Sequence, residues 1–394
     1  MTGPLDGIRV LDVSTFLAGP YAATLLGDFG ADVIKIEPPE GDESRHLGPE
    51  RGGERAPFVA VNRNKRGVVL DLEDARGRAA AGRLIATADV LITNVREPAL
   101  SRLGLSYEQA RAHRDDIIWA GVTAFGPDGP YAGRPGIDFL AQGYAGLIAL
   151  NGDPAGPKVR MAVPLVDVMT SLLVANGVLA ALHERGASGL GQRIDVSLLD
   201  ALVHAQSTGL ASLFLADETP PRTGNRSRYF APSGIYACAG GDLICITCPT
   251  EKFFRNLARA LGADWPSDPR FETIALRLEH QDEIDSEIAS RCATYTRADL
   301  LDKLVAADVL AAPVNELPDV VRDPQVRHNE MIVTIEHATL GPLDVTGVPV
   351  KLARTPGSVR RSPPVLGQHT TEVLAELGYS AQEIEAMQGG RSDG

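Results

Sequence analysis

The sequence predicts an α/β protein, in which a parallel, doubly wound sheet is followed by a second, smaller α+β domain. Two observations support this prediction. Up to about Phe125, short apolar runs alternate with helical stretches, and strands separated by single helices form parallel βαβ units. From about Asp217 the chain changes to turn-rich segments, short strands and charge-rich helices.

The elements of the parallel sheet each have a signal in the sequence. Gly19-Pro20 opens the first helix and Gly30 ends it, because proline suits the first helical turn and glycine the position after the last. A further helix is expected at 73–86. The expected strands are 8–14, 31–37, 68–72, 88–94 and 117–125. Parallel sheets bind ligands at the carboxyl ends of their strands, so the segments of interest are 14–19, 37–39, 94–96 and 125–126.

The remainder of the chain is first helical and then mixed. A long apolar helix is expected at 167–184, a loop at 185–193 and a second helix at 196–216. Short strands are expected within 234–247, and strands return within 331–352 before a terminal helix. The charge-rich helices are expected at 251–262, 281–293 and 297–308.

The composition excludes several functions. There are 51 acidic and 38 basic residues, a formal charge of −13, whereas a nucleic-acid groove needs a basic face. No stretch approaches the ~20 uninterrupted apolar residues of a membrane span, and residues 1–9 lack the features of a signal peptide. We therefore expect a cytoplasmic protein with no nucleic-acid and no membrane partner.

The sequence gives no sign of a metal or nucleotide cofactor. The first turn, STFLAGPYAA, lacks the GxGxxG pattern of a dinucleotide site, and no P-loop, HExxH or GxSxG motif is present. NAD and a catalytic metal are not expected. Buried structural thiols are the expected role of the cysteines, with a redox or zinc role as the alternative; the cysteines are Cys238, Cys245, Cys248 and Cys292.

Two aspartates are candidates for chemistry. Asp138 lies in GRPGIDFLAQGYAG and Asp167 in RMAVPLVDVMTSLL, and each precedes an apolar helical run. Aspartate is a common N-cap residue, so a purely structural role is one interpretation. The other is a carboxylate nucleophile aimed by a helix N-terminus.

Two basic segments, 62–67 and 96–104, have two interpretations. They are either solvated loops or sites at which arginines such as Arg96 and Arg102 bind phosphate. The eight histidines are scattered without shared spacing, so none is expected to be a ligand.

A set of motifs runs in order along nearly the whole chain. It opens with PLDGIRVLDVSTFLAGPYAATLLGDFGADVIKIEPPEGD. It continues with NRNKRGVVLDL, ADVLITN, LSRLGL, GRPGIDFLAQGYAG, VLAALHERGASGLGQRIDVSLLDA, RTGN, APSGIYAC and SPPVLGQHTTEVLAELG. From about residue 4 to about residue 385 the chain resembles the family III CoA-transferases (the CaiB/BaiF type), a group that contains formyl-CoA transferase, carnitine CoA-transferase and the α-methylacyl-CoA racemases.

The resemblance implies a domain plan and an assembly. A Rossmann-like, CoA-binding large domain is interrupted by the smaller domain and completed by the C-terminal segment, and two chains interlock as a homodimer. With the composition boundaries, this plan assigns 1–190 to the large domain, 191–216 to a linker helix, 217–330 to the small domain and 331–394 to the return linker and the rest of the large domain.

The resemblance also implies the reaction and its nucleophile. The family's catalytic aspartate follows the AQ-x-x-x-G motif at the head of the long helix, where this chain has Asp167. In such enzymes the carboxylate attacks an acyl-CoA thioester, for example succinyl-CoA, and an aspartyl-CoA thioester forms that exchanges with a free carboxylic acid. The residues implied in binding coenzyme A are Leu17, Ala18, Asn94, Val95, Arg96, Arg102 and Asp138.

Two departures from the family pattern affect the site. Pro38 stands where some relatives have a phosphate-binding arginine, so this contact is either missing or supplied by Arg45 or Arg63 instead. RTGNRSRYFAPSG begins with the matching Gly224-Asn225 but continues with bulky residues, so a glycine-rich lid is not predicted.

The alternatives are a racemase-like isomerase and an acyl-CoA-binding protein without catalysis. Racemases of this family need a histidine directly before the aspartate of the GIDFLAQG motif, where this chain has Ile137. Isoleucine cannot transfer a proton, and the presence of Asp167 argues against a mere binding protein. The sequence therefore predicts a CoA-transferase, without specifying the donor or the acceptor.

Overall fold

The computed structural model describes residues 3–388 and divides into two compact units. Unit 1 comprises the chain up to Leu147, Met161–Phe214 and the chain from Pro324. Unit 2 comprises Ile148–Arg160 and Leu215–Asp323. The domain boundaries expected from the sequence stay a prediction.

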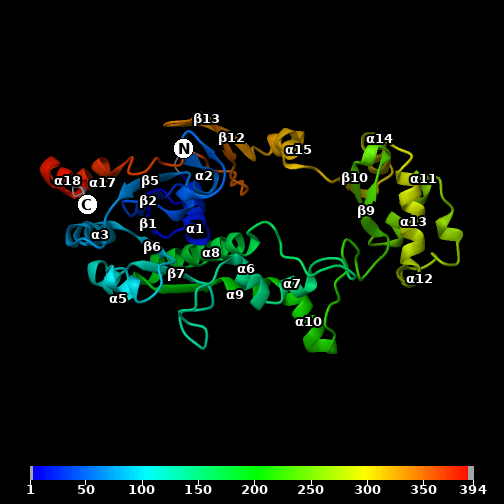
Figure 1. Cartoon of the computed structure of the whole chain (residues 1–394), viewed down its shortest axis with the longest axis horizontal. Helices are drawn as coiled ribbons and strands as arrows, with labels where there is room; N and C mark the ends of the chain where they lie inside the picture. Colours follow the sequence, from blue (N-terminus) through cyan, green and yellow to red (C-terminus); the bar gives the residue numbers. More distant parts are fainter. Residues whose placement is uncertain (1–2, 389–394) are drawn as a thin grey trace. The chain divides into compact units, whose positions relative to one another are not determined.

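A parallel six-stranded sheet forms the centre of unit 1, in the order β5-β2-β1-β6-β7-β8 (Figure 1). Its strands are β1 (Arg9–Val13), β2 (Asp32–Glu37), β5 (Lys65–Val69), β6 (Val90–Thr93), β7 (Ile118–Thr123) and β8 (Arg193–Ser197). This confirms the predicted α/β class and parallel sheet. On one side of β1 the sheet continues through β2 to β5, and on the other side it continues through β6 and β7 to β8. The strand order therefore reverses between β1 and β6.

Two strand predictions need correction. β5 begins at Lys65, three residues before the predicted run at 68–72, because its first two residues are charged yet buried. β8 lies where the sequence predicts a loop and the start of a helix. Arg193 and Asp195 alternate with Ile194 and Val196 in the half-buried pattern of an edge strand.

The predicted helix at 196–216 is two helices. α9 (Leu198–Ala205) begins after Ser197, whose side chain caps it by accepting a hydrogen bond from the backbone N–H of Asp200. α10 (Ser207–Ala216) follows at a bend of 63°. The apolar composition of this stretch gives no sign of the break at Gln206.

The two faces of the sheet have separate apolar cores, because successive strand residues point to opposite sides. Val10 and Ile92 belong to one core, and Leu11 and Leu91 belong to the other. The first core is covered by α1 (Ala18–Asp28) and α8 (Leu165–Ser188). The second is covered by α3 (Ala75–Thr87), α5 (Tyr107–His113), α17 (Thr370–Glu376) and α18 (Ala381–Gln388).

The long helix α8 is apolar enough in length and composition to cross a membrane. It is a core helix of unit 1, in which Val166, Val174 and Val178 are completely buried. Its contacts with α1 and β7 account for the buried part of its apolar sequence, while Leu172 and Leu179 stay exposed.

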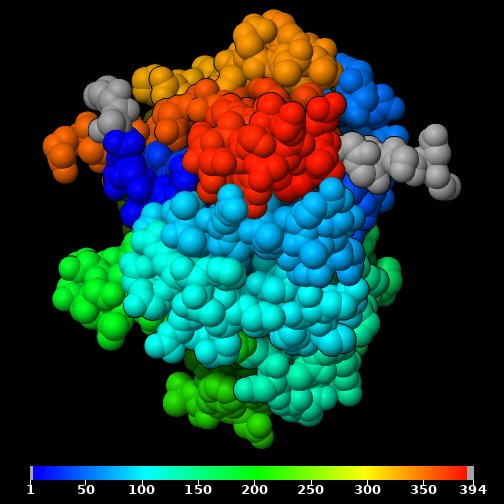
Figure 2. Space-filling view, turned by 90° about the vertical axis from the view of Figure 1, so that its left-hand side faces the viewer, coloured from blue at the N-terminus to red at the C-terminus, as the bar shows by residue number. Residues whose placement is uncertain are grey.

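The C-terminal segment returns to the β5 edge of the sheet. The His369 backbone N–H donates to the Gly67 carbonyl, and the Val69 N–H donates to Thr370 Oγ1. Figure 2 shows the C-terminal residues, in red, directly against the light-blue residues of α3. There Arg76 donates to the Ala386 carbonyl.

Smaller elements complete unit 1 and the connections to unit 2. The 3-10 helix η1 spans Glu43–His46. The two-stranded ribbons are β3 (Glu50–Arg51) with β4 (Glu54–Arg55), and β12 (Ile332–His337) with β13 (Gly341–Thr346). The short helices are α2 (Ala56–Ala60), α4 (Ala99–Arg102), α6 (Asp138–Tyr144), α7 (Leu147–Leu150) and α16 (Pro324–His328).

Unit 2 has an antiparallel sheet in the order β11-β10-β9, formed by β9 (Ser233–Ala237), β10 (Leu243–Thr247) and β11 (Leu310–Pro313). Its helices are α11 (Glu251–Leu261), α12 (Ile274–Glu279), α13 (Gln281–Cys292), α14 (Arg297–Ala306) and α15 (Leu317–Arg322), with 3-10 turns at Ala239–Gly241 and Trp265–Ser267. The three predicted charge-rich helices correspond to α11, α13 and α14. Their apolar faces, including Phe254, Ile288 and Leu304, form one core with the sheet.

Candidate active site

The loops that follow β1 and β6 meet where the strand order reverses. Asn94 follows β6, and its Oδ1 accepts a hydrogen bond from the Thr15 N–H at 2.9 Å. Its Nδ2 donates to the Thr15 carbonyl, also at 2.9 Å. Two segments that the sequence singles out, 14–19 and 94–96, therefore lie side by side at the edge where open α/β sheets bind ligands.

The first turn leads directly into α1, which begins at Ala18. Leu17 is half-buried and Ala18 is buried, so this turn presents a partly apolar surface at the edge of the sheet. Gly19 is required by close packing, because a Cβ atom there would lie 2.4 Å from Ser14 Oγ. Glycine thus allows α1 to start immediately beside the end of β1.

The residues after β6 differ in their surroundings. Val95 is half-buried against the core beneath α3, and Arg96 is exposed. Arg102 forms a 2.8 Å ion pair with Glu73, in which both side chains are more than half exposed. Such exposed pairs contribute little stability, so Arg102 can exchange Glu73 for another anion at small cost.

Asp138 joins two helices. It is the first residue of α6, and its Oδ2 accepts hydrogen bonds from the backbone N–H groups of Val166 at 2.8 Å and Asp167 at 3.3 Å. Its Oδ1 accepts a 2.6 Å bond from Gln142 Nε2. Pro164 gives α8 no side-chain cap, so Asp138 acts as the cap of α8 from a distant position in the sequence.

Asp167 lies in the first turn of α8 and is half-buried. Within the described range 3–388 its carboxylate forms no ion pair. Burial raises the pKa of Asp167 to about 7, and the negative charge of Asp138 adds to the effect. Both causes disfavour the ionised form, so this side chain is a weakly solvated carboxylate that titrates near neutral pH.

Ser171 connects the nucleophile candidate to the first turn. Its Oγ lies 2.8 Å from the carbonyl oxygen of Ala18 and 2.8 Å from that of Asp167. Ser171 is not among the residues that the sequence patterns single out. Its spacing of four residues after Asp167, one helical turn, is the only local signal for it.

Comparison with known proteins identifies the family. The model of "CoA-transferase family III" matches residues 5–370. The chain belongs to this family. The resemblance seen in the sequence is thereby confirmed, and the protein is a CoA-transferase.

The family III relatives are similar over their full length. The chain is 33% identical to "Succinyl-CoA--D-citramalate CoA-transferase" of Chloroflexus aurantiacus, over 98% of both chains. It is 34% identical to "Succinate--glutarate CoA-transferase" of Agrobacterium fabrum, over 95% of this chain and 96% of the relative. A crystal structure of a CaiB/BaiF family protein from Brucella suis matches with a TM-score of 0.88 at 32% identity, over 96% of this chain and 100% of that one.

Both candidates to replace the family's phosphate-binding arginine at Pro38 are ion-paired in the structure. Arg45 donates to both oxygens of Glu37, at 2.6 and 2.9 Å. Arg63 is 1% exposed and forms a 2.6 Å ion pair with Asp28. Both guanidinium groups are already paired with carboxylates in this structure, which favours the alternative that the contact made by the missing arginine is absent.

The thiols and the metal-ligating residues give no second site. In the part of the chain that the structure describes, no group of three or more His, Cys, Asp or Glu side chains could hold a metal ion. Burial raises the pKa of Cys248 and Cys292 to about 12, so these thiols are poor nucleophiles. Cys238 is buried as well, Cys245 is half-buried, and all four cysteines are free.

A recess of about 430 Å³ opens at the opposite, amino edge of the sheet. It is lined in part by Arg9, Asp32 and Arg66 at the starts of β1, β2 and β5. Arg9 and Arg66 are ion-paired with Asp32 and Glu376, and Arg360 and Arg361 also line the recess. The recess therefore lies away from Asp138 and the first turn, and two of its arginines are already paired with carboxylates.

Proposed function

We propose that this family III enzyme moves CoA from an acyl-CoA donor to a free carboxylic acid through a thioester on Asp167. The observation that carries the proposal is the Asp138–Asp167 pair at the head of α8. The Asp167 carboxylate is half-buried, has a pKa near 7 and has no cationic partner among the described residues. Such a carboxylate is a stronger nucleophile than that of an ordinary aspartate. Ser171 lies between the first helical turn of α8, which carries this carboxylate, and the start of α1, and it contacts the backbone of both.

The proposed reaction has four acyl-transfer steps. The Asp167 carboxylate attacks the donor thioester carbon, and CoA thiolate leaves as a mixed anhydride forms. The thiolate attacks the aspartyl carbonyl, which releases the donor acid and leaves an aspartyl-CoA thioester. The acceptor carboxylate attacks that thioester, and the released thiolate attacks the acceptor's acyl carbon, which gives the new acyl-CoA and restores the Asp167 carboxylate.

The first turn and the loop after β6 are the proposed CoA site. Arginine is suited to phosphate because it donates several hydrogen bonds at fixed geometry. Arg96 is exposed and Arg102 is held only by an exposed ion pair, so both are available for the phosphates. The contacts proposed for coenzyme A are Leu17, Ala18, Asn94, Val95, Arg96, Arg102 and Asp138.

Asp138 has a structural role as well. Three of its hydrogen bonds go to α8 and Gln142, so its proposed place beside the thioester comes in addition to capping. Burial is the larger cause of the raised pKa of Asp167, and the charge of Asp138 adds to it. Asp138 therefore supports the nucleophile whether or not it touches the substrate.

The relatives suggest the donor. Their printed names include succinyl-CoA and the acids D-citramalate, L-malate and glutarate. We propose succinyl-CoA as the donor and a small dicarboxylic acid as the acceptor. Since the family fold is shared by enzymes of different substrates, the acceptor must be found by screening.

We also propose that two copies of the chain form a homodimer. Unit 1 exposes large apolar side chains on and near α6, α8 and α10, which is typical of interaction surfaces. They include Ile137, Leu172 and Phe214, at 62%, 52% and 80% exposure. Two relatives are named as alpha and beta subunits, so light scattering of the purified chain should distinguish a self-contained dimer from a monomer that needs a second subunit.

We propose a cytoplasmic location because of the state of the cysteine thiols. Four free cysteines suit a reducing compartment. The isomerase alternative is disfavoured because Ile137, directly before Asp138, carries no group that could accept a proton.

The test is mass spectrometry of the intact protein after incubation with succinyl-CoA, with Asp167→Ala as the comparison. We expect a CoA-sized or acyl adduct on the natural protein only, mapped to the peptide that contains Asp167. An equal adduct on Asp167→Ala would disprove the assignment. If a panel of thioesters gives no adduct while CoA still binds, the covalent mechanism is wrong.

A further inference from the structure

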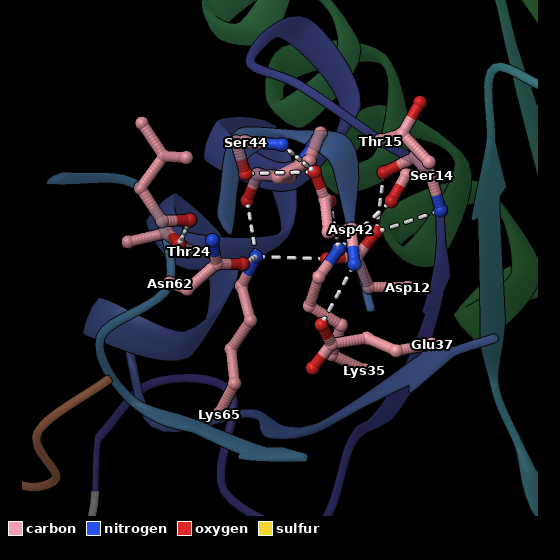
Figure 3. Close-up of polar contacts among 12 residues, drawn as sticks. Asp12, Ser14, Thr15, Thr24, Lys35, Glu37, Asp42, Ser44, Asn62 and Lys65 are labelled. Atoms are coloured by element: carbon pink, nitrogen blue, oxygen red, sulfur yellow. Dashed lines mark hydrogen bonds and ion pairs between the residues drawn. The ribbon is translucent and has the colours of Figure 1, made fainter. Parts of the chain in front are cut away.

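Four charged side chains are buried beneath the first turn, on three neighbouring strands and the loop after β2 (Figure 3). They are Asp12 on β1, Lys35 on β2, Lys65 on β5 and Asp42, and none is more than 1% exposed. Lys65 Nζ lies 2.8 Å from Asp12 Oδ2, and Lys35 Nζ lies 2.9 Å from Asp42 Oδ2. We call these four residues the buried charge network; its two acids and two lysines balance.

Stability alone does not explain such a network. Removing a charged group from water costs several kcal/mol, and replacing buried ion pairs by apolar side chains is often neutral or stabilising. The network must therefore be explained by the groups that it holds in place, beyond its own ion pairs.

Each member of the network also bonds to the turn between β1 and α1 or, in the case of Lys65, to the first turn of α1. Asp12 Oδ1 accepts hydrogen bonds from the N–H and the hydroxyl of Ser14. The other contacts are Lys35 Nζ to the Ser14 carbonyl (2.8 Å), Asp42 Oδ1 from the Phe16 N–H (3.2 Å) and Lys65 Nζ to the Pro20 carbonyl (2.7 Å). The buried charges thus bind the backbone at Ser14 and Phe16 in this turn and at Pro20 in the helix that follows it.

The turn needs this support, because its conformation is unfavourable in isolation. Phe16 has a φ of +63°, a left-handed conformation that costs a residue with a Cβ atom about 1–2 kcal/mol. Its N–H is held by Asp42, and the preceding Thr15 is held by Asn94. The strained residue lies directly before Leu17.

The same turn is coupled to the nucleophile. Ser171 Oγ lies within hydrogen-bond distance of the carbonyl groups of Ala18 and Asp167. If the turn between β1 and α1 is displaced, the backbone at Ala18 therefore moves relative to Asp167 in α8. The geometry connects the buried charge network, through the backbone at 14–20, to Asp167.

We propose that Asp12, Lys35, Asp42 and Lys65 are positioning residues that hold the first turn in the conformation that binds CoA and align it with Asp167. This inference rests on the proposed function, because it takes Leu17 and Ala18 as CoA contacts. It adds a role for four residues that touch neither the thioester nor the acceptor.

The test variant is Lys35→Met, which keeps the apolar stem but removes the cation and its bond to the Ser14 carbonyl. Calorimetry with free CoA and steady-state kinetics with succinyl-CoA are the measurements. We expect the Kd for CoA and the KM for the donor to rise about tenfold, a factor that corresponds to about 1.4 kcal/mol. The KM for the acceptor acid and the mass of the adduct at saturating donor should stay unchanged.

A matched control separates positioning from stability. Arg63→Met also removes a buried cation from an ion pair in unit 1, with Asp28, and the side-chain bonds of Arg63 go to Asp28 and Thr346 rather than to the turn at 14–20. We expect it to lower the free energy of unfolding as Lys35→Met does, while the Kd for CoA stays within twofold of the natural protein. Should Lys35→Met not fold, the charge-balanced pair Lys35→Met with Asp42→Asn replaces it, since it leaves no unpaired buried charge.

The outcomes are distinguishable. Equal Kd values for CoA in the natural protein and the Lys35 variant, or equal losses in the Lys35 and Arg63 variants, would overturn the positioning role and leave the proposed function intact. Full turnover by Asp167→Ala would overturn the proposed function, yet CoA binding by the Lys35 variant would still test the positioning role.

Discussion

Asp12 and Asp167 are two acids of the same unit that are withdrawn from water but have opposite partners. Burial alone would raise the pKa of Asp12, but Lys35 and Lys65 outweigh it, and the pKa of Asp12 is lowered. Burial raises the pKa of Asp167 to about 7, and the nearby carboxylate of Asp138 adds to this shift where Asp12 has cations to oppose it. Burial makes a carboxylate either a fixed structural anion or a reactive group, and its neighbours decide which.

The largest expected effect separates the two acids by activity. Asp167→Asn replaces the nucleophile by a group of the same shape that cannot form a thioester. We expect kcat to fall about 10³-fold or more, as for other nucleophile replacements, with the Kd for CoA nearly unchanged. A kcat within tenfold of the natural enzyme would remove Asp167 from the reaction.

The second effect separates Asp12 from Asp167 by the free energy of unfolding. Asp12→Asn leaves Lys35 and Lys65 without a shared buried counter-charge. Breaking a buried pair in this way typically costs about 3–5 kcal/mol. Urea unfolding at pH 7 measures it, and a loss below about 1 kcal/mol would mean that the network does not depend on the Asp12 charge.

The third effect has the opposite sign. The pKa of Asp167 is raised in the folded state, so the folded protein binds an extra proton between about pH 4 and pH 7 and loses that advantage as pH rises through 7. Asp167→Asn should therefore be more stable than the natural protein at pH 8, by about 1–3 kcal/mol, and nearly equal to it at pH 4. Thermal unfolding at both pH values gives the comparison; a variant that is less stable at pH 8 would contradict it.

The smallest effect concerns the neighbour of the nucleophile. Because Asp167 must be ionised to attack, kcat/KM should rise with pH through about 7. Asp138→Asn removes the charge that contributes to this raised pKa, so the rise should move to lower pH. The pKa of Asp167 should still stay above the usual range of aspartate, since burial is the larger cause of its shift. An unmoved profile would mean that Asp138 acts only as the cap of α8.

Much of this site follows from local sequence patterns. The alternation of apolar runs and helices predicts the parallel sheet, and the segments at its carboxyl edge include the first turn and Asn94. Asp138 and Asp167 each precede a helical run, and an acid at such a position is a candidate for either capping or chemistry. The family resemblance favours the nucleophile at Asp167, and the hydrogen bonds of Asp138 give that residue the capping role.

Other features depend on contacts between distant residues and leave no local signal. Lys65 and Arg66 look like a solvated loop, because their ion-pair partners lie elsewhere in the chain, on other elements. For the same reason Arg63 resembles a free phosphate ligand, although Asp28 holds it. Charged residues in a strand are recognisable only once their counter-charges are known.

The return of the C-terminal segment to β5 has a consequence for synthesis of the protein. The Gly67 N–H is hydrogen-bonded to His369 Nδ1, 302 residues later, and the Asn64 N–H donates to the Arg361 carbonyl. While the ribosome makes all of unit 2, the nascent chain therefore carries an open strand edge, the kind of template to which other chains add. The β5 edge of the sheet is covered only once residues 361–370 have been made, so a chain that stalls or is truncated before them keeps this edge open to aggregation.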